Sequence, residues 1–247
     1  MNTMLSTIKK IMVIALVGVI NMSGHAQEIK LNLGVDVMSR YVWRGTSLSN
    51  GVVVQPSLQL TKDNLTLGVW GSSAVTNSDD YKEVDLSVSY TFLNGLFTVG
   101  LTDYYIVKEQ DQSGERYFNL KEDTKHVLEA GVAFSGSKAF PVGVLFAMNC
   151  WGADKTKDGG QQHSMYVELN YSKTIADNEV AFSCGITPFE PDDKSTAYYG
   201  VTAGIVNLGV KVTRTISLFQ GCKLPVSVQT IVNPMSENVF LVAGIHF

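Results

Sequence analysis

Charged and amide side chains recur at polar positions of segments in which polar and apolar residues otherwise alternate. Burying such a group is unfavourable unless it is paired or in contact with water. If the polar faces of these segments surround an interior, the charged and amide side chains either line a water path or pair with one another across it. The candidates for this inner surface are Asp36, Arg40, Arg44, Asp85, Glu129, Glu168, Asn170 and Lys211.

Arg40 and Arg44 are the two residues to which we assign a functional role. They lie four residues apart at the end of the first alternating segment, so a strand would place both on its polar face. Their guanidinium groups would then stand near the mouth of the interior. The alternative role is structural, with an ion pair to Asp36 or Glu83 that fixes the register of the strands.

Hydrolytic chemistry is one alternative to a water path. A hydroxyl two residues from a histidine would point the same way on a strand, as a nucleophile and its base must. Thr124 with His126 is the only such pair after residue 26. The segment Asp154 to Gly159 has a faint likeness to a calcium loop, but its twelfth position is Met165 instead of Glu. We predict no enzyme activity and no catalytic, cofactor-binding or metal-binding residues.

The alternation has the period of two that is typical of β-strands with one apolar face. Apolar side chains at every second position from Val84 to Phe92, for example, alternate with polar ones from Glu83 to Thr91. About twelve such segments occur, although ten or fourteen strands would also fit. The predicted strands cover residues 28–43, 52–62, 65–75, 82–92, 96–107, 124–136, 142–152, 164–174, 179–189, 198–217, 224–233 and 238–247.

Short and long connections alternate between these strands. An antiparallel up-and-down barrel has this pattern, with short turns on the periplasmic side and longer extracellular loops. The long connections are predicted at Arg44 to Gly51, Thr76 to Tyr81, Lys108 to Asp123, Ala153 to His163 and Glu190 to Ala197.

The hydrophobic residues, 45% of the chain, form no apolar run near the ~18 residues of a membrane helix after Ala26. Their spread over alternating segments predicts an all-β transmembrane barrel without helices. The alternative fold is a soluble periplasmic sandwich whose apolar faces pack on each other. Pro56 lies inside a predicted strand, where it cannot donate a ladder hydrogen bond, so we expect a bulge or bend there.

The first residues differ in kind from the rest. Lys9 and Lys10 precede an apolar stretch from Ile11 to Ile20, and small residues follow up to Ala26. This is the pattern of a cleaved signal peptide. We therefore predict a signal peptide at residues 1–26 and one barrel domain at residues 27–247. The formal net charge of −4 provides no basic footprint for nucleic acid.

Several motifs resemble a known family. The segment Ser39 to Ser49 (SRYVWRGTSLS) resembles the opening of the TorF-type porins, a family of poorly characterised bacterial outer-membrane proteins. Gln55 to Ser57 and Val69 to Ser72 resemble its next two strands, and the ending from Ile231 to Phe247 is similar to relatives from the Bacteroidetes. The resemblance implies an outer-membrane barrel with a pore function. It transfers no catalytic or binding residues.

The last strand ends in an alternating apolar stripe that closes on a terminal phenylalanine. It resembles the signal that the barrel-assembly machinery reads. The residues of this stripe are Val239, Leu241, Ala243, Ile245 and Phe247.

These observations predict a narrow channel for small hydrophilic solutes in the outer membrane of a Gram-negative bacterium. The partners would be outer-membrane lipid, lipopolysaccharide and the barrel-assembly machinery, whereas the pattern carries no information on oligomeric state. The alternative is a non-conducting structural or adhesion barrel that acts through its extracellular loops, above all Lys108 to Asp123. An outer-membrane lipid hydrolase is a third and weaker alternative.

Overall fold

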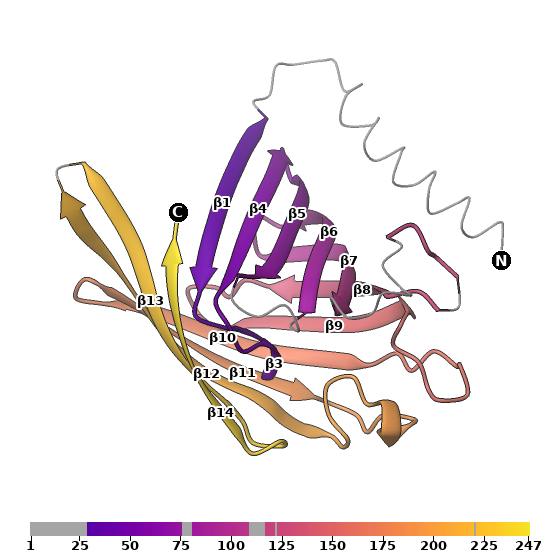
Figure 1. The fold of residues 1–247 in the computed structure, drawn as a ribbon. Coiled ribbons are helices and arrows are strands. Elements are labelled where there is room, and N and C mark those ends of the chain that lie inside the picture. The colour runs from indigo at the N-terminus through magenta and orange to yellow at the C-terminus, as the bar shows by residue number, and fades with distance from the viewer. Residues whose placement is uncertain (1–28, 76–80, 109–116, 122, 220) are drawn as a thin grey trace, which may run out of the picture.

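The computed structural model describes residues 29–75, 81–108, 117–121, 123–219 and 221–247. Twelve antiparallel strands form a closed barrel, in which each strand pairs with its neighbours in the chain and β1 also pairs with β14 (Figure 1). The wall strands are β1 (Lys30–Met38), β4 (Val53–Lys62), β5 (Leu65–Ala74), β6 (Tyr81–Phe92), β7 (Phe97–Lys108), β8 (His126–Phe134), β9 (Gly143–Gly152), β10 (Met165–Ile175), β11 (Asn178–Thr187), β12 (Gly204–Phe219), β13 (Cys222–Asn233) and β14 (Asn238–His246).

Alternation along each strand gives the wall an apolar outer face and a polar inner face. On β6 the side chain of Val84 is 41% exposed, whereas that of its neighbour Glu83 is 2% exposed. The same exposed apolar face recurs around the barrel at Val69, Leu101, Val132, Phe146, Leu169, Phe182, Val210, Val228 and Leu241. Both the all-β class and the count of twelve strands are confirmed. The alternative of a sandwich is wrong, because there is one closed wall sheet instead of two packed sheets.

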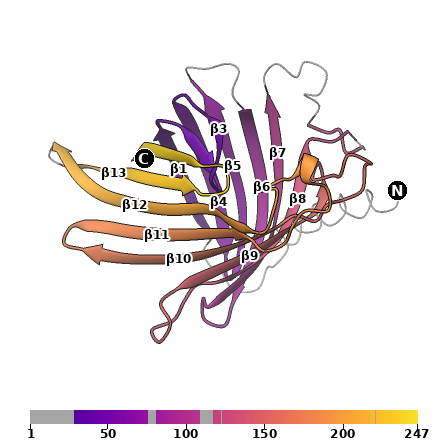
Figure 2. The same ribbon diagram turned by 90° about the horizontal axis from the view of Figure 1, so that it is seen from below.

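The two ends of the barrel differ as the connection lengths predict. Tight turns join β4 to β5, β6 to β7 and β10 to β11, with left-handed residues at Asp63, Leu93 and Ala176. The longer connections gather at the other end. Strands β4–β7 and β10–β13 make two sides of the wall, which Figure 2 shows from below.

The seam between the first and last strands is short. The paired register of β1 and β14 covers Asp36 to Met38, and backbone hydrogen bonds of Val35 with Phe247 and of Ser39 with Ala243 extend it by one residue at each end. Side chains extend the closure, since His246 contacts Asp36 Oδ1 through Nδ1 at 2.8 Å and Ser227 Oγ through Nε2 at 2.9 Å. These three residues come from β1, β13 and β14, so their contacts join both ends of the chain.

The first predicted strand, 28–43, is not one wall strand. It ends at Met38, and the chain then leaves the wall to form a two-stranded hairpin of β2 (Tyr41–Trp43) and β3 (Thr46–Ser49). The predicted loop from Arg44 to Gly51 is therefore largely the turn and second strand of this hairpin. In Figure 1 the hairpin, in dark indigo, turns away from β1 and β4 toward the opposite side. We call it the inner hairpin.

The predicted start of β12 and the bulge expected at Pro56 both need correction. Residues 198–203 lie in the loop before β12, because Tyr199 turns inward and packs on Tyr166 and Val206. The bulge expected at Pro56 is absent, since β4 and β5 keep one register on both sides of it. Pro56 instead pairs only with Val35 of β1.

Helical structure is confined to one 3-10 turn, η1 (Lys194–Thr196), among the residues that the structure describes. No helix in those residues is long and apolar enough to cross a membrane. The predicted signal peptide, residues 1–26, lies outside the described residues, as does most of the predicted loop from Lys108 to Asp123.

Candidate functional site

The inner hairpin meets the far wall at its tip. Arg44 and Gly45 form its two-residue turn, and both have positive φ values, 49° and 80°. A Cβ on Gly45 would lie 1.8 Å from the carbonyl oxygen of Val206, so only glycine fits this approach. Asn233 on β13 donates a hydrogen bond to the Gly45 carbonyl oxygen at 3.1 Å. The hairpin therefore spans the interior from β1 and β4 to β12 and β13.

Irregularities of the wall coincide with this contact. The ladder of β11 and β12 shifts register beside Gly185, which leaves Val206 without a partner in it. A second shift, between Leu128 and Glu129, leaves Cys150 unpaired on β9. Bulges commonly redirect backbone and side chains next to functional sites. Here one presents the Val206 carbonyl to the hairpin tip, and the other adjoins Glu129.

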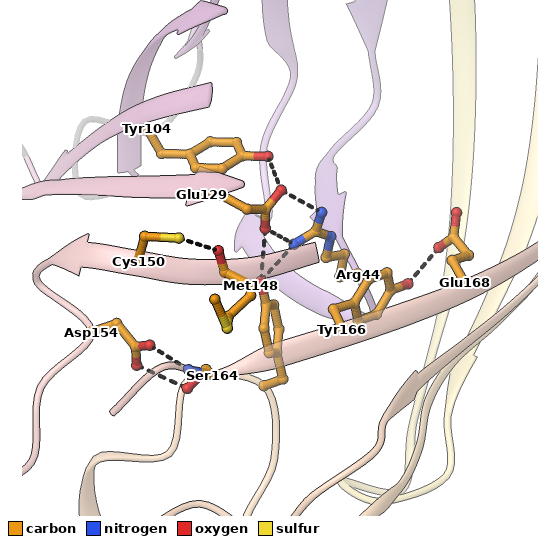
Figure 3. Close-up of polar contacts among 10 residues, drawn as sticks. Arg44, Tyr104, Glu129, Met148, Cys150, Asp154, Ser164, Tyr166 and Glu168 are labelled. Atoms are coloured by element: carbon orange, nitrogen blue, oxygen red, sulfur yellow. Dashed lines mark hydrogen bonds and ion pairs between the residues drawn. The ribbon is translucent and has the colours of Figure 1, made fainter. Parts of the chain in front are cut away.

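Arg44 forms a two-pronged ion pair with Glu129 of β8. The distances are 2.5 Å from Nη1 to Oε2 and 3.0 Å from Nη2 to Oε1 (Figure 3). Tyr104 and Tyr199 also donate hydrogen bonds to this carboxylate, at 3.0 and 3.1 Å. The side chains of Arg44 and Glu129 are 9% and 7% exposed, so the pair is well shielded from solvent.

Aromatic rings surround the guanidinium group. Its carbon lies 4.6 Å from the ring centre of Trp43, 4.4 Å from Tyr166 and 5.4 Å from Tyr199. These distances are in the range of favourable cation–π contacts. Burial raises the pKa of Tyr199 well above its ordinary value, so this phenol stays neutral and remains a hydrogen-bond donor. We call this set of residues, with Glu129 and Tyr104, the arginine layer.

A second polar group adjoins the arginine layer. Tyr166 donates a hydrogen bond to Glu168 (Figure 3). Asn207 donates to both of them at 3.2 Å. No described Lys, Arg or His forms an ion pair with Glu168. The carboxylate is thus held by neutral donors close to the charge of Arg44.

Two hollows lie on either side of the arginine layer. A cavity of about 340 Å³ lies between the inner hairpin and strands β4–β7, with Trp43 and Tyr104 among its lining residues. A second hollow of about 200 Å³ lies among the long loops and is lined by Tyr198 and Tyr199. The inner hairpin and the arginine layer therefore separate an external hollow from an internal cavity.

Comparisons with known proteins place the chain in a family. The family model described as "Bacterial protein of unknown function (Gcw_chp)" matches residues 23–205. The chain belongs to the Gcw_chp family. That match includes the inner hairpin and, in the wall and loops, Glu129 and Tyr199. No curated protein matches the sequence.

Two solved structures are similar to this chain. The first is a KdgM porin, with a TM-score of 0.46 and 9% sequence identity over 87% of this chain and 97% of that one. The second is the COG4313 outer membrane channel from Pseudomonas putida F1, with a TM-score of 0.41 and 12% identity over 92% of this chain and 96% of that one. The resemblance of this Gcw_chp protein to TorF-type porins, and to Bacteroidetes members, stays a prediction.

The predicted inner-surface residues fall in three places. Arg44, Glu129 and Glu168 meet at the arginine layer, whereas Asp85 lines the internal cavity. Arg44 pairs with neither Asp36 nor Glu83, which corrects the structural alternative offered from the sequence. The remaining four lie elsewhere: Asp36 at the seam, Arg40 over the ring of Phe240 at 5.7 Å, Asn170 opposite Ser183, and Lys211 opposite Gln229.

The candidate hydrolytic pair is not arranged for catalysis. Thr124 Oγ1 accepts a hydrogen bond from the backbone N–H of His126 and does not contact its ring. The ring instead contacts Asp103 through Nδ1 at 2.9 Å and the carbonyl oxygen of Tyr117 through Nε2. Both ring nitrogens thus face acceptors, which leaves none to accept a proton from a nucleophile.

At the seam, a serine, a histidine and an aspartate side chain lie in a row. Ser227 contacts Nε2 of His246, and Nδ1 of His246 contacts Asp36. This is the arrangement of the Ser–His–Asp triad in serine hydrolases. Ser227, however, is 4% exposed, and its backbone is paired with Thr213 on one side and Gly244 on the other. The ladders therefore use the neighbouring N–H groups that an oxyanion would need. We assign this row to closure of the barrel.

In the segment with a faint likeness to a calcium loop, the acidic side chain that opens it is bonded within the protein. Asp154 is buried and accepts hydrogen bonds from the backbone N–H and the hydroxyl of Ser164, at 2.7 and 2.9 Å. No group of three or more acidic, His or Cys residues suited to a metal ion occurs among the described residues.

Sequence reasoning missed most of the arginine layer. The sequence pattern did not single out Tyr104, Tyr166 or Tyr199 as partners of Arg44, nor Asn233 as a partner of Gly45. The Trp-Arg-Gly segment carried the available signal, because an Arg-Gly pair between two alternating segments resembles the turn of a hairpin. The partners come from β7, β8, β10 and β13, and only the closed barrel brings them together.

Proposed function

We propose that this Gcw_chp protein is an outer-membrane channel for small hydrophilic solutes, narrowed by its inner hairpin. The continuous apolar face of the wall supports a lipid environment, because so large an exposed apolar surface is unfavourable in water. The polar inner face supports a wet interior. Export through a cleaved signal peptide, and contact with outer-membrane lipid and lipopolysaccharide, are part of this proposal.

The observation that carries the proposal is the position of the arginine layer between two hollows. The external hollow reaches Tyr198 and Tyr199, and the internal cavity reaches Trp43 and Tyr104. The rings of Trp43 and Tyr104 are 5.4 Å apart, and those of Trp43 and Tyr199 are 5.9 Å apart. The barrier between the hollows is therefore only a few side chains thick. A small displacement of the inner hairpin would connect them.

One observation favours the alternative of a non-conducting structural or adhesion barrel. The buried charge of Arg44 is fully paired across the interior, as a permanent closure would require. A closure of this kind would leave the long loops as the active surface. The two candidates differ in a measurable way, because only the channel passes ions.

The test is single-channel recording of the refolded full-length protein in planar bilayers, after a heat-modifiable shift on gels has verified its folding. A channel gives discrete current steps with brief openings, because the inner hairpin must move. A folded, inserted protein that stays silent at all voltages and salt concentrations would refute the channel and favour the structural barrel.

A further inference from the structure

The internal cavity has a carboxylate flanked by two rings in the wall. Asp85 on β6 is directly paired with Trp70 on β5 and with Tyr104 on β7. Directly paired residues on neighbouring strands point to the same face and lie about 5 Å apart. Trp70, Asp85 and Tyr104 thus form a row on the inner face, and all three line the cavity.

The inner hairpin adds two more rings opposite this row. Tyr41 and Trp43 alternate on β2, so both side chains leave the hairpin on the same side. The ring of Tyr41 lies 5.5 Å from that of Trp70, and the ring of Trp43 lies 5.4 Å from that of Tyr104. Four rings and one carboxylate therefore line one cavity of about 340 Å³. We call it the aromatic box.

The carboxyl groups beside these rings have no internal counterion among the described residues. Asp85 Oδ1 is buried and has no hydrogen-bonding partner among the described residues. Glu83, two residues earlier on the same face, is 2% exposed, and no described Lys, Arg or His forms an ion pair with either carboxylate. The nearby cation, Arg44, is already paired with Glu129.

We propose that the aromatic box binds an organic cation, of the amine or quaternary ammonium class. Aromatic faces attract such cations, and a shielded carboxylate strengthens the attraction. A neutral sugar could pack on the rings but would leave the carboxylates uncompensated. An anion would be repelled by them. A small inorganic cation would gain little from four rings, because it requires several oxygen ligands.

This inference deepens the proposed channel function by naming a class of solute, and it rests on that function only for transport. Binding itself requires the folded barrel alone. Two of the three tryptophans of the chain, Trp43 and Trp70, line the aromatic box, so intrinsic fluorescence reports its occupancy.

The experiment titrates the refolded full-length protein in detergent with choline chloride at constant ionic strength, held with sodium chloride. The matched ligand control is 3,3-dimethylbutan-1-ol, which has the shape of choline without its charge. We expect saturable quenching with choline, at least about tenfold weaker with the neutral alcohol, and none with maltose. Equal responses to choline and the alcohol, a response only to maltose, or none at all would overturn the proposal.

Variants locate the site. Asp85→Asn keeps the shape of the side chain and removes its charge, and it should weaken choline binding roughly tenfold. Glu179→Gln removes a carboxylate from β11, which does not line the aromatic box, and should leave binding unchanged. Equal losses in both variants would indicate general surface attraction and overturn the assignment. If Asp85→Asn does not fold, the comparison of choline with its neutral analogue on the unaltered protein still tests whether the aromatic box prefers a cation.

The two proposals fail separately. A protein that binds choline and never conducts refutes the channel but keeps the aromatic box as a binding site. A protein that conducts and shows no preference for choline over the alcohol refutes the aromatic box but keeps the channel.

Discussion

Replacing Arg44 by methionine should release the inner hairpin. Methionine keeps the length of the side chain but removes both hydrogen bonds to Glu129 and the cation–π contacts with the surrounding rings. It also leaves the Glu129 carboxylate buried with only Tyr104 and Tyr199 as donors. The docked position of the hairpin loses its main attachment, while the wall ladders are untouched.

The magnitude follows from the shielding of the ion pair. Removal of one partner from a buried ion pair costs about 3–5 kcal/mol, because the other charge stays uncompensated. Exposures of 9% and 7% place Arg44 and Glu129 in that regime. Each factor of ten in an equilibrium constant corresponds to about 1.4 kcal/mol. We therefore expect the ratio of undocked to docked hairpin to rise by at least roughly a hundredfold.

The assay is the open probability in planar bilayers of four proteins: unaltered, Arg44→Met, Arg44→Lys and Arg40→Met. Arg44→Lys keeps a charge but loses the planar fork, so its effect should be intermediate. Arg40→Met is the matched control, because the guanidinium of Arg40 lies over the ring of Phe240 and forms no ion pair among the described residues. Adding Glu129→Met to Arg44→Met removes the unpaired carboxylate and should recover much of the lost stability.

The reasoning would be refuted by an Arg44→Met protein with the open probability and denaturant midpoint of the unaltered barrel. It would also be refuted if Arg40→Met and Arg44→Met had the same effect, since a general loss of positive charge would then explain both. A large loss of stability without any gain in current would assign the ion pair to the fold alone.

Three further outcomes are expected. Gly45→Ala places a Cβ against the Val206 carbonyl oxygen at a positive φ, so it should undock the hairpin and raise the open probability with Arg44 intact. The Ser195 hydroxyl and neighbouring N–H groups lower the pKa of Asp193 to about 2, below its ordinary value. Its contribution to loop order should thus be complete above about pH 4 and lost as the pH falls toward about 2. Amide exchange of Ser195 measures this loss, and Asp193→Asn should abolish the pH dependence. Phe247→Ser removes the exposed end of the apolar stripe but keeps the backbone hydrogen bonds of residue 247 with Val35, so it should lower the yield of heat-modifiable barrel in outer membranes with unchanged refolding in detergent.

The amino-acid sequence alone was sufficient for the wall. Alternation such as that from Glu83 to Phe92 decides which side chains face outward, since successive residues on a strand point to opposite faces. The alternation of short and long connections decides which end of the barrel bears the loops. Both are local properties, so the sequence alone predicts about twelve strands, their approximate limits and the polar inner face.

The content of the interior is not local. Arg44 meets Glu129, 85 positions later, and Tyr199, 155 positions later. Asn233 holds Gly45 across 188 positions. The pattern around Ser39 to Gly51 indicates a hairpin turn at most. It does not say whether that hairpin stays in the wall or turns inward, because both have apolar and polar residues in alternation.

Closure of the barrel makes that choice. It fixes which strands face each other, and bulges beside Val206 and Glu129 then adjust a carbonyl and a carboxylate to the hairpin tip. The sequence therefore dictates a barrel with charged residues inside. Only the tertiary structure decides that Arg44 is paired and Asp85 is not, because pairing depends on distances between side chains of strands far apart in the chain.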